Sequence, residues 1–161
     1  MEPIVRAYHE TDASAVVRLS LRAWAPVFAS ERDVMGDEIF DQLNGDDWRR
    51  QQQHDVEKVL ADEATEVWVA EVNGGVVGFV AAVLKVDSRM GEVYMLAVDP
   101  DSQNQGLGTQ LTSVATEWIR EAGMSLALVS TGGDDGHAAA RRTYEKAGYT
   151  PVPSVNYFRA L

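Results

Sequence analysis

The stretch that decides the fold runs from position 92 to position 108 and reads Glu92-Val-Tyr-Met-Leu-Ala-Val98-Asp-Pro-Asp-Ser-Gln-Asn-Gln-Gly-Leu-Gly108. Its first seven residues are rich in β-branched, aromatic and aliphatic types, which is typical of a buried strand. Asp99-Pro100 ends that strand, because proline has no N–H for strand pairing and favours a turn. A polar loop with two glycines follows, and an amphipathic helix is predicted from about Gly106.

The loop from Gln103 to Gly108 lies where a phosphate group can be bound. The start of a helix presents unpaired backbone N–H groups and a partial positive charge, so a pyrophosphate can bind there without lysine. Glycine at 106 and 108 would let phosphates approach the backbone closely. Neither a Walker loop nor a dinucleotide fingerprint fits, because Gly-Lys-Ser/Thr is absent and position 111 is Leu. On spacing alone, an ordinary strand-to-helix turn is also compatible with these residues.

Outward from this stretch, the sequence predicts a mixed α/β or α+β sheet with helices packed against it, because strand-like and helix-like periods alternate along the chain. Asn73-Gly74 is the pair that a tight hairpin turn prefers. The predicted elements, in the order β-α-α-β-β-β-α-β-α-β, are a strand at 4–7, a helix from 11 that Pro26 ends or kinks, a helix clearest over 48–60, strands at 66–72, 76–84 and 92–98, a helix from 106 to Gly123, a strand at 125–130, a helix at 137–147 and an extended segment at 150–161.

The composition predicts one folded domain spanning residues 1–161, because 45% of the residues are hydrophobic and 24% are charged. No apolar run reaches the roughly 18 to 20 residues that a membrane helix needs, and the first residues do not resemble a signal segment. We therefore expect a cytoplasmic protein without a membrane partner. The chain has no cysteine and three widely spaced histidines, so we expect no disulfide, no thiolate nucleophile and no metal site.

The charge is strongly acidic, with 14 Lys and Arg against 25 Asp and Glu and a net charge of −11. This balance argues against a nucleic-acid partner, since basic groups supply most of the affinity for phosphates. Within residues 10–66 there are 14 acidic and 6 basic side chains, a difference of −8, so most of the excess lies there. Two interpretations are open: a solvated surface that aids solubility, or a region that attracts a cationic substrate.

Two segments of the chain resemble motifs of the GNAT family of N-acetyltransferases. Val98 to Gly108 is similar to the family signature Q/R-x-x-G-x-G/A, which likewise follows a strand ending in Leu-Ala-Val. Ala140-Arg-Arg-Thr-Tyr144-Glu-Lys-Ala-Gly-Tyr149 resembles the second motif, Asn-x-x-Ala-x-x-x-Tyr-x-x-x-Gly-Phe. The resemblance covers residues 66–150 closely. It implies the acyl-CoA N-acyltransferase fold, with a mixed, mostly antiparallel sheet flanked by helices.

The resemblance also implies acetyl-CoA as cosubstrate, no metal, and a set of binding residues. The pantetheine arm would pair with the strand backbone, where the amide near Leu96 would face the acetyl carbonyl and stabilise the oxyanion. His137 replaces the Asn of the family motif, so its contact with the arm has a different geometry. Arg141 and Arg142 would reach the coenzyme phosphates or lie in solvent. The expected coenzyme-binding residues are Leu96, Ala97 and Val98 for the arm, Gln103, Asn104, Gln105, Gly106, Leu107, Gly108 and Thr109 for the pyrophosphate, and His137 and Arg141.

Two residues are candidates for proton transfer. An amine of pKa about 10.4 is protonated at neutral pH and must lose a proton before it attacks, and Glu92 is the candidate base, by similarity to the strand of histone-type members. By strand alternation Glu92 shares a face with Leu96 unless a bulge intervenes. Tyr144, the motif tyrosine, is the candidate acid that protonates the leaving thiolate or donates a hydrogen bond to it. A solvated Glu92 and a packing Tyr144 are the structural alternatives.

The sequence therefore predicts direct transfer of acetyl from acetyl-CoA to a primary amine of a small molecule or peptide in a ternary complex. The acidic N-terminal half favours a cationic acceptor, and a homodimer is possible, as in related folds. An alternative is a non-catalytic acyl-CoA-binding or sensing module that docks a protein partner. The residues expected on the acceptor side are the aromatic Trp24, Phe28 and Trp48, which would otherwise belong to the core, and the acidic Glu31, Asp33, Asp37, Glu38 and Asp41.

Overall fold

A computed structural model describes residues 2–161 and contains a five-stranded sheet in the order β1-β2-β3-β4-β5. Neighbouring strands are antiparallel except β4 and β5, which are parallel. The strands are β1 (Ile4–Ala7), β2 (Glu66–Val72), β3 (Gly75–Lys85), β4 (Met90–Val98) and β5 (Leu126–Val129). The helices are α1 (Ala13–Met35), α2 (Asp37–Asn44), α3 (Trp48–Ala61), α4 (Leu107–Glu121) and α5 (Ala138–Lys146).

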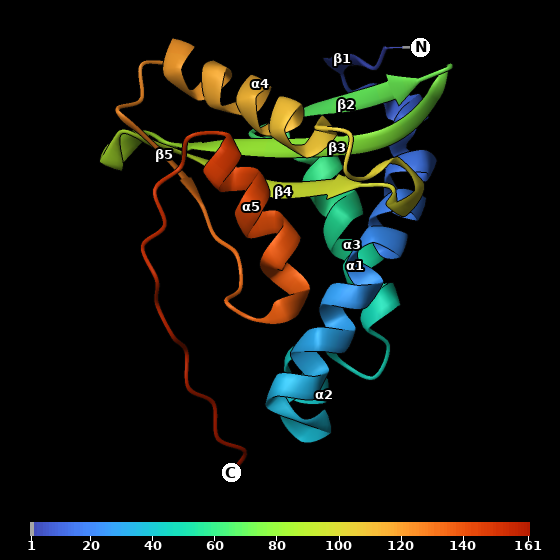
Figure 1. The fold of residues 1–161 in the computed structure, drawn as a ribbon, viewed down its shortest axis with the longest axis vertical. Helices are drawn as coiled ribbons and strands as arrows, with labels where there is room; N and C mark the ends of the chain where they lie inside the picture. The colour runs from blue at the N-terminus through green and yellow to red at the C-terminus, as the bar shows by residue number, and fades with distance from the viewer. Residues whose placement is uncertain (1) are drawn as a thin grey trace.

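Helices cover both faces of the sheet, and each face has its own apolar core (Figure 1). On one face α4 packs Leu111 and Ile119 against Val80 and Val93. On the other, α1 and α3 pack Val16 and Val56 against residues that include Phe79. Because side chains alternate along each strand, the two cores take alternate residues of β3 and β4. No helix within residues 2–161 is long and apolar enough to cross a membrane.

The predicted fold class is confirmed, and the strands lie close to the predicted ranges. The hairpin between β2 and β3 turns at Asn73 and Gly74, whose φ angles of 52° and 81° fit the turn type that this pair favours.

The element order differs from the prediction in two places. Three helices, not two, precede β2, because Gly36 and Gly45 adopt φ of 81° and 74° and divide the polar segment. Pro26 lies inside α1 and does not end it. Residues 150–161 form no strand, and the chain leaves the body of the molecule beyond α5 (Figure 1).

The packing of α4 on β4 requires glycine at one strand position. A Cβ on Gly91 would lie 2.4 Å and 2.5 Å from side-chain carbons of Ile119, which is buried. We predict that Gly91→Ala lowers the free energy of unfolding by about 1–3 kcal/mol, the usual cost of overpacking a core. Gly133→Ala is the matched control, because its Cβ would meet nothing within 4 Å. Chemical denaturation compares the two variants, and equal stabilities would contradict the packing argument.

Candidate active site

The sheet opens between β4 and β5. The two strands pair only from Met90 to Val93 on β4 and from Leu126 to Val129 on β5. Beyond Val93, β4 continues to Val98 while β5 has ended. The second half of β4 is therefore paired with β3 on one side and exposes a free strand edge on the other. Such an edge can accept an extended ligand as an additional strand.

A β-bulge lies where the two strands separate. The pairing of β3 with β4 shifts between Ala81, opposite Met95, and Ala82, opposite Val93, so that Tyr94 is the extra residue. Val93 and Leu96 consequently both face α4, and Met95 belongs to the core beneath α1. Glu92 precedes Val93 and points to the α1 side. The bulge thus places the Glu92 and Leu96 side chains on opposite faces, whereas unbroken alternation would place them together.

The backbone of β4 directs two residues into the gap. The Asp99 N–H donates to the Val77 oxygen of β3 at 2.8 Å, so the backbone groups of Asp99 face β3. Because the backbone N–H and C=O groups of successive residues point to alternate edges of a strand, those of Ala97 also face β3, while those of Leu96 and Val98 face the gap. The side-chain amide of Gln103 donates to the Val98 oxygen at 3.0 Å and lies at this same edge. The Leu96 N–H is therefore directed toward the space between the strands.

The loop after β4 carries backbone amides to the end of this gap. Asn104 and Gly106 adopt left-handed φ angles of 62° and 81°, which turn the chain into α4. Gln110 makes the first intrahelical bond, to the Gly106 oxygen at 3.0 Å. The N–H groups of the preceding turn, from Leu107 to Thr109, therefore have no acceptor in the helix. Together with the helix dipole, these amides can bind an anion such as a pyrophosphate.

Gly108 allows α5 to approach the first turn of α4. A Cβ at this position would lie 3.1 Å from Thr143 Cγ2 and 4.0 Å from Leu96 Cδ2, so α4, α5 and β4 meet here. The residue after Thr143 is Tyr144, whose ring packs edge-on against Tyr149 at 6.4 Å between centroids. Tyr149 is held by a 2.6 Å hydrogen bond between its hydroxyl and Thr116 Oγ1. Tyr144 is thus a residue of α5 that follows directly on the one that meets the start of α4.

Burial raises the pKa of Tyr144 to about 12. The hydroxyl is therefore protonated throughout the neutral range and can donate a hydrogen bond. Full transfer of its proton to a thiolate is unfavourable, because the pKa of a thiol, about 8.5, lies well below that of Tyr144. The environment of Tyr144 favours hydrogen bonding to a thiolate over full proton transfer.

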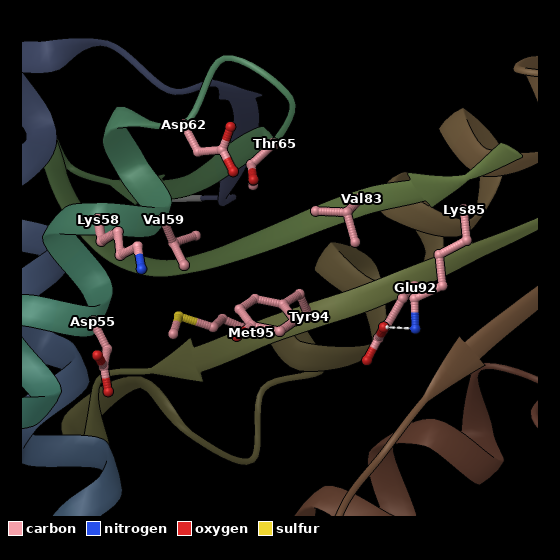
Figure 2. A pocket seen from close by; sticks show the side chains of 10 residues that line it. All are labelled: Asp55, Lys58, Val59, Asp62, Thr65, Val83, Lys85, Glu92, Tyr94 and Met95. Carbon is pink, nitrogen blue, oxygen red and sulfur yellow. Dashed lines mark ion pairs between the residues drawn. The ribbon is translucent and has the colours of Figure 1, made fainter.

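An open groove of about 520 Å³ lies on the α3 side of the sheet, beside Glu92 (Figure 2). The Glu92 carboxylate points into it from β4, and its Oε2 lies 2.6 Å from the Lys85 Nζ of β3. The Glu92 side chain is only 15% exposed, and the Lys85 side chain is 46% exposed. Three carboxylates and two ammonium groups line the groove. Its lining is Asp55, Lys58, Val59, Asp62, Thr65, Val83, Lys85, Glu92, Tyr94 and Met95.

A polar cluster joins α1 to the loop between β5 and α5. The Ser30 hydroxyl donates to Asp134 Oδ2 at 2.5 Å and accepts from the Gly136 N–H at 3.0 Å. Asp134 Oδ1 lies 2.5 Å from His137 Nδ1, and Glu31 Oε1 lies 3.7 Å from His137 Nε2. Both ring nitrogens of His137 thus face carboxylates. A Cβ on Gly136 would lie 2.5 Å from Ser30 Cβ, so glycine is needed for this close approach.

The cluster shifts the pKa of two carboxyl groups in opposite directions. Burial alone would raise the pKa of Asp134, but hydrogen bonds from Ser30 and His137 and the charge of His137 outweigh it and lower the pKa. Burial raises the pKa of Glu31, and the charge of His137 opposes this. Asp134 is therefore a stable carboxylate, and the ring N–H at Nδ1 of His137 donates to it.

The other predicted site residues lie in varied surroundings. Arg141 donates from Nη1 to the Gly132 and Asp134 oxygens, both at 2.7 Å, and so holds the loop before α5, while Arg142 is exposed. Trp24 packs against Phe79 of the core, with ring centroids 6.2 Å apart. Phe28 stacks on Trp48 at 4.4 Å, where α1 meets α3. Asp37 and Asp41 form ion pairs with Arg32.

Sequence reasoning missed several residues of the site. Asp55 and Lys85 line the groove, and Ser30 and Asp134 hold His137. The only local signal was the spacing from Asp134 to His137, which is common at helix starts. The remaining contacts join residues far apart in the chain.

The comparisons with known proteins decide the family. Residues 31–149 match the model of the acetyltransferase (GNAT) family. The chain belongs to the GNAT family. Among curated relatives, the mycothiol acetyltransferase of Beutenbergia cavernae is 30% identical over 149 residues, which are 92% of this chain and 45% of that protein. The mycothiol acetyltransferase of Sanguibacter keddieii is 37% identical over 103 residues, 56% of this chain and 32% of that protein. The chain thus spans less than half the length of these two relatives.

Solved structures of GNAT enzymes share the fold. AAC(6')-Iy, in complex with the bisubstrate analogue CoA-S-monomethyl-acetylneamine, superposes with a TM-score of 0.69 at 15% identity, over 100% of this chain and 99% of that chain. The ribosomal-protein-alanine N-acetyltransferase from Brucella melitensis biovar Abortus 2308 superposes with a TM-score of 0.63 at 20% identity, over 99% and 100% of the two chains. The likeness confirms the predicted GNAT fold.

The polar cluster predicts a pH dependence of stability. Because the pKa of Asp134 is lowered on folding, its contribution is complete above the unfolded pKa of about 3.9 and is lost as the pH falls through the lower folded value. Asp134→Asn should cost about 1–3 kcal/mol at pH 7 and lose less stability than the wild type as the pH falls below about 4. The neighbouring exposed substitution Asp135→Asn is the control. Parallel losses in Asp134→Asn and the wild type on acid titration would contradict this assignment.

Proposed function

We propose that the protein is an acetyl-CoA-dependent N-acetyltransferase that transfers the acetyl group directly to a primary amine in a ternary complex. One observation carries this proposal: the free edge of β4 at Leu96 and Val98 leads to the unpaired amides at the start of α4. The edge suits an extended pantetheine arm, and the amides suit a pyrophosphate. Membership of the GNAT family supports the same cosubstrate.

In the proposed reaction, Glu92 removes a proton from the ammonium group of the acceptor, directly or through water. The neutral nitrogen then attacks the thioester carbonyl and forms a C–N bond. The developing oxyanion accepts a hydrogen bond from the Leu96 N–H. The C–S bond breaks, and the thiolate leaves with a hydrogen bond from the Tyr144 hydroxyl. After the attack the nitrogen is positively charged and loses its second proton as the amide forms. This proton balances the one that the thiolate takes, and Glu92 releases the first proton to solvent.

The groove beside Glu92 is the proposed acceptor site. Its three carboxylates exceed its two ammonium groups by one, and Lys85 is already paired with Glu92. Asp55 and Asp62 therefore remain against Lys58 alone. The excess of carboxylates favours an acceptor that carries positive charge. The name of the relatives, mycothiol acetyltransferase, favours a small molecule over a protein as the acceptor.

The alternative is a module that binds acyl-CoA without catalysis. An assay of free thiol release from acetyl-CoA across a panel of small amines and N-terminal peptides separates the two. We expect amine-dependent release that Glu92→Gln slows at neutral pH and that high pH partly restores, because the acceptor then loses its proton to solvent. Acetyl-CoA binding without release on any amine would support the alternative.

Tyr144→Phe tests the role of the phenol. Because the hydroxyl is proposed to donate a hydrogen bond to the leaving thiolate, the substitution should reduce kcat by about 10²–10³-fold, as loss of a hydrogen-bond donor to a developing negative charge does. The Kd for acetyl-CoA, measured by calorimetry, should change less than threefold. Tyr149→Phe is the matched control, since it removes the neighbouring hydroxyl that bonds Thr116. An unchanged kcat in Tyr144→Phe would exclude the residue from the mechanism.

The charge of the groove is tested by Asp55→Asn and Asp62→Asn. Each should raise the KM for a cationic amine severalfold and weaken the fall of kcat/KM with added salt, because screening acts on the charge that was removed. Glu57→Gln is the control, an exposed carboxylate of the same helix that does not line the groove. If Glu57→Gln changes the KM as much as Asp55→Asn and Asp62→Asn do, the effect comes from the net charge of the surface, and the groove has no special role in binding the amine.

A further inference from the structure

Lys85 and Glu92 occupy diagonal positions on neighbouring strands. In the register of β3 with β4, Val83 is opposite Glu92 and Lys85 is opposite Met90. Lys85 comes two residues after Val83, so its side chain lies on the same face of the sheet as that of Glu92. Diagonal neighbours on one face are within reach of long side chains. The two side chains form an ion pair, with Nζ of Lys85 2.6 Å from Oε2 of Glu92.

The ion pair occupies one oxygen of the Glu92 carboxylate and leaves the other free of Lys85. Figure 2 shows Oε2 joined to Lys85 by the dashed line, while the second oxygen lies on the side away from Lys85. Met90, opposite Lys85, precedes Glu92 in β4, whereas Leu96, the proposed oxyanion donor, follows it. Lys85 therefore approaches Glu92 from the end of the strand that is remote from Leu96. The second oxygen is the one available to an acceptor or to a water molecule.

The Glu92 carboxylate needs a positive neighbour because it is largely buried. Most of the water that would stabilise a free carboxylate is excluded from it, and an ammonium group in contact offsets the lost hydration. Lys85 is about half exposed, so its ammonium group keeps part of its own hydration while it pairs with Glu92. Without this partner, the Glu92 side chain would be free to turn toward solvent or toward another positive charge in the groove.

The same ion pair sets a limit on how a cationic acceptor engages Glu92. Lys58 and Lys85 are the two ammonium groups that line the groove, and Lys85 is the one in contact with Glu92. With Lys85 in place, an incoming ammonium group meets a carboxylate with one oxygen already occupied. If Lys85 were removed, both oxygens could contact the incoming group. The acceptor would then bind more tightly, but the carboxylate would no longer be held in one orientation.

We propose that Lys85 is a positioning residue for acetyl transfer. Its ion pair fixes the orientation of the Glu92 side chain and restricts an incoming ammonium group to the free carboxylate oxygen. The proton then passes from the ammonium group to that oxygen, directly or through water, and Lys85 itself gives up no proton. This role rests on the proposed function, because Lys85 acts only through the base.

Steady-state kinetics of Lys85→Gln test this role. The constants are measured on the best acceptor of an amine panel that includes 2-phenylethylamine, 1,5-diaminopentane and glycinamide. We expect kcat to fall about tenfold, because the base is no longer held in place. We expect KM to fall by about two- to fivefold, because a positive charge has left the groove. A joint fall of kcat and KM indicates that bound substrate has lost a restraint, whereas lost binding would raise KM.

Two further variants separate positioning from the charge of the groove. Lys85→Arg retains the positive charge and should recover most of the kcat. Lys58→Gln removes the same charge from α3, across the groove from Glu92 (Figure 2). It should lower KM as Lys85→Gln does, with a much smaller effect on kcat. Equal losses of kcat in Lys58→Gln and Lys85→Gln would overturn the proposal, because the effect would then come from the charge alone.

The double variant Lys85→Gln/Glu92→Gln shows whether Lys85 acts through Glu92. Its kcat should equal that of Glu92→Gln alone, because no carboxylate is left to position. A further loss of kcat in the double variant would reveal a general structural effect of Lys85. An unchanged kcat in Lys85→Gln, in an enzyme that Glu92→Gln slows, would show that the base needs no partner. Either result overturns the proposal and leaves the proposed function standing, whereas a wild type that acetylates no amine of the panel overturns both.

Discussion

One extra residue in β4 sets the geometry on which the rest of the site depends. The bulge at Tyr94 turns the second half of β4 away from the register of its first half, at the point where pairing with β5 ends. Strand pairing would otherwise satisfy both edges of β4. Because pairing with β5 stops here, the Leu96 and Val98 backbone groups face an open gap. Because of the bulge, the Glu92 side chain faces the opposite side of the sheet from the Leu96 side chain. The gap, the proposed oxyanion donor and the proposed base follow from this local change.

The charges of the chain divide between the two proposed substrates. The coenzyme is anionic, and the protein offers it backbone amides and a helix dipole at Leu107–Thr109, which need no lysine. The proposed acceptor is a cationic amine, which the carboxylates of the groove beside Glu92 would attract. The cluster of Ser30, Asp134 and His137 links α1 to the loop before α5, and α5 carries Tyr144. The net charge of −11 is therefore compatible with binding an anionic cosubstrate.

Much of the fold was predictable because its signals are local. The hairpin at Asn73-Gly74, the strand that ends at Asp99-Pro100 and the glycine-containing turn before α4 each follow from a few neighbouring residues. The contacts of His137 were not predictable in this way, since Ser30 and Glu31 lie more than a hundred positions earlier in the chain. The strand expected at 150–161 is absent from the single chain for a related reason. A strand needs a partner, and local sequence does not specify where that partner lies.

The central claim is that the open edge of β4 and the start of α4 bind acetyl-CoA together. Amide hydrogen exchange at single-residue resolution, measured with and without acetyl-CoA, tests it most directly. The account predicts slower exchange at Leu96 and Val98 and at Leu107, Gly108 and Thr109, with little change at Ala97, whose backbone already faces β3. Saturating acetyl-CoA that leaves Leu96, Val98 and the first turn of α4 unprotected would contradict it.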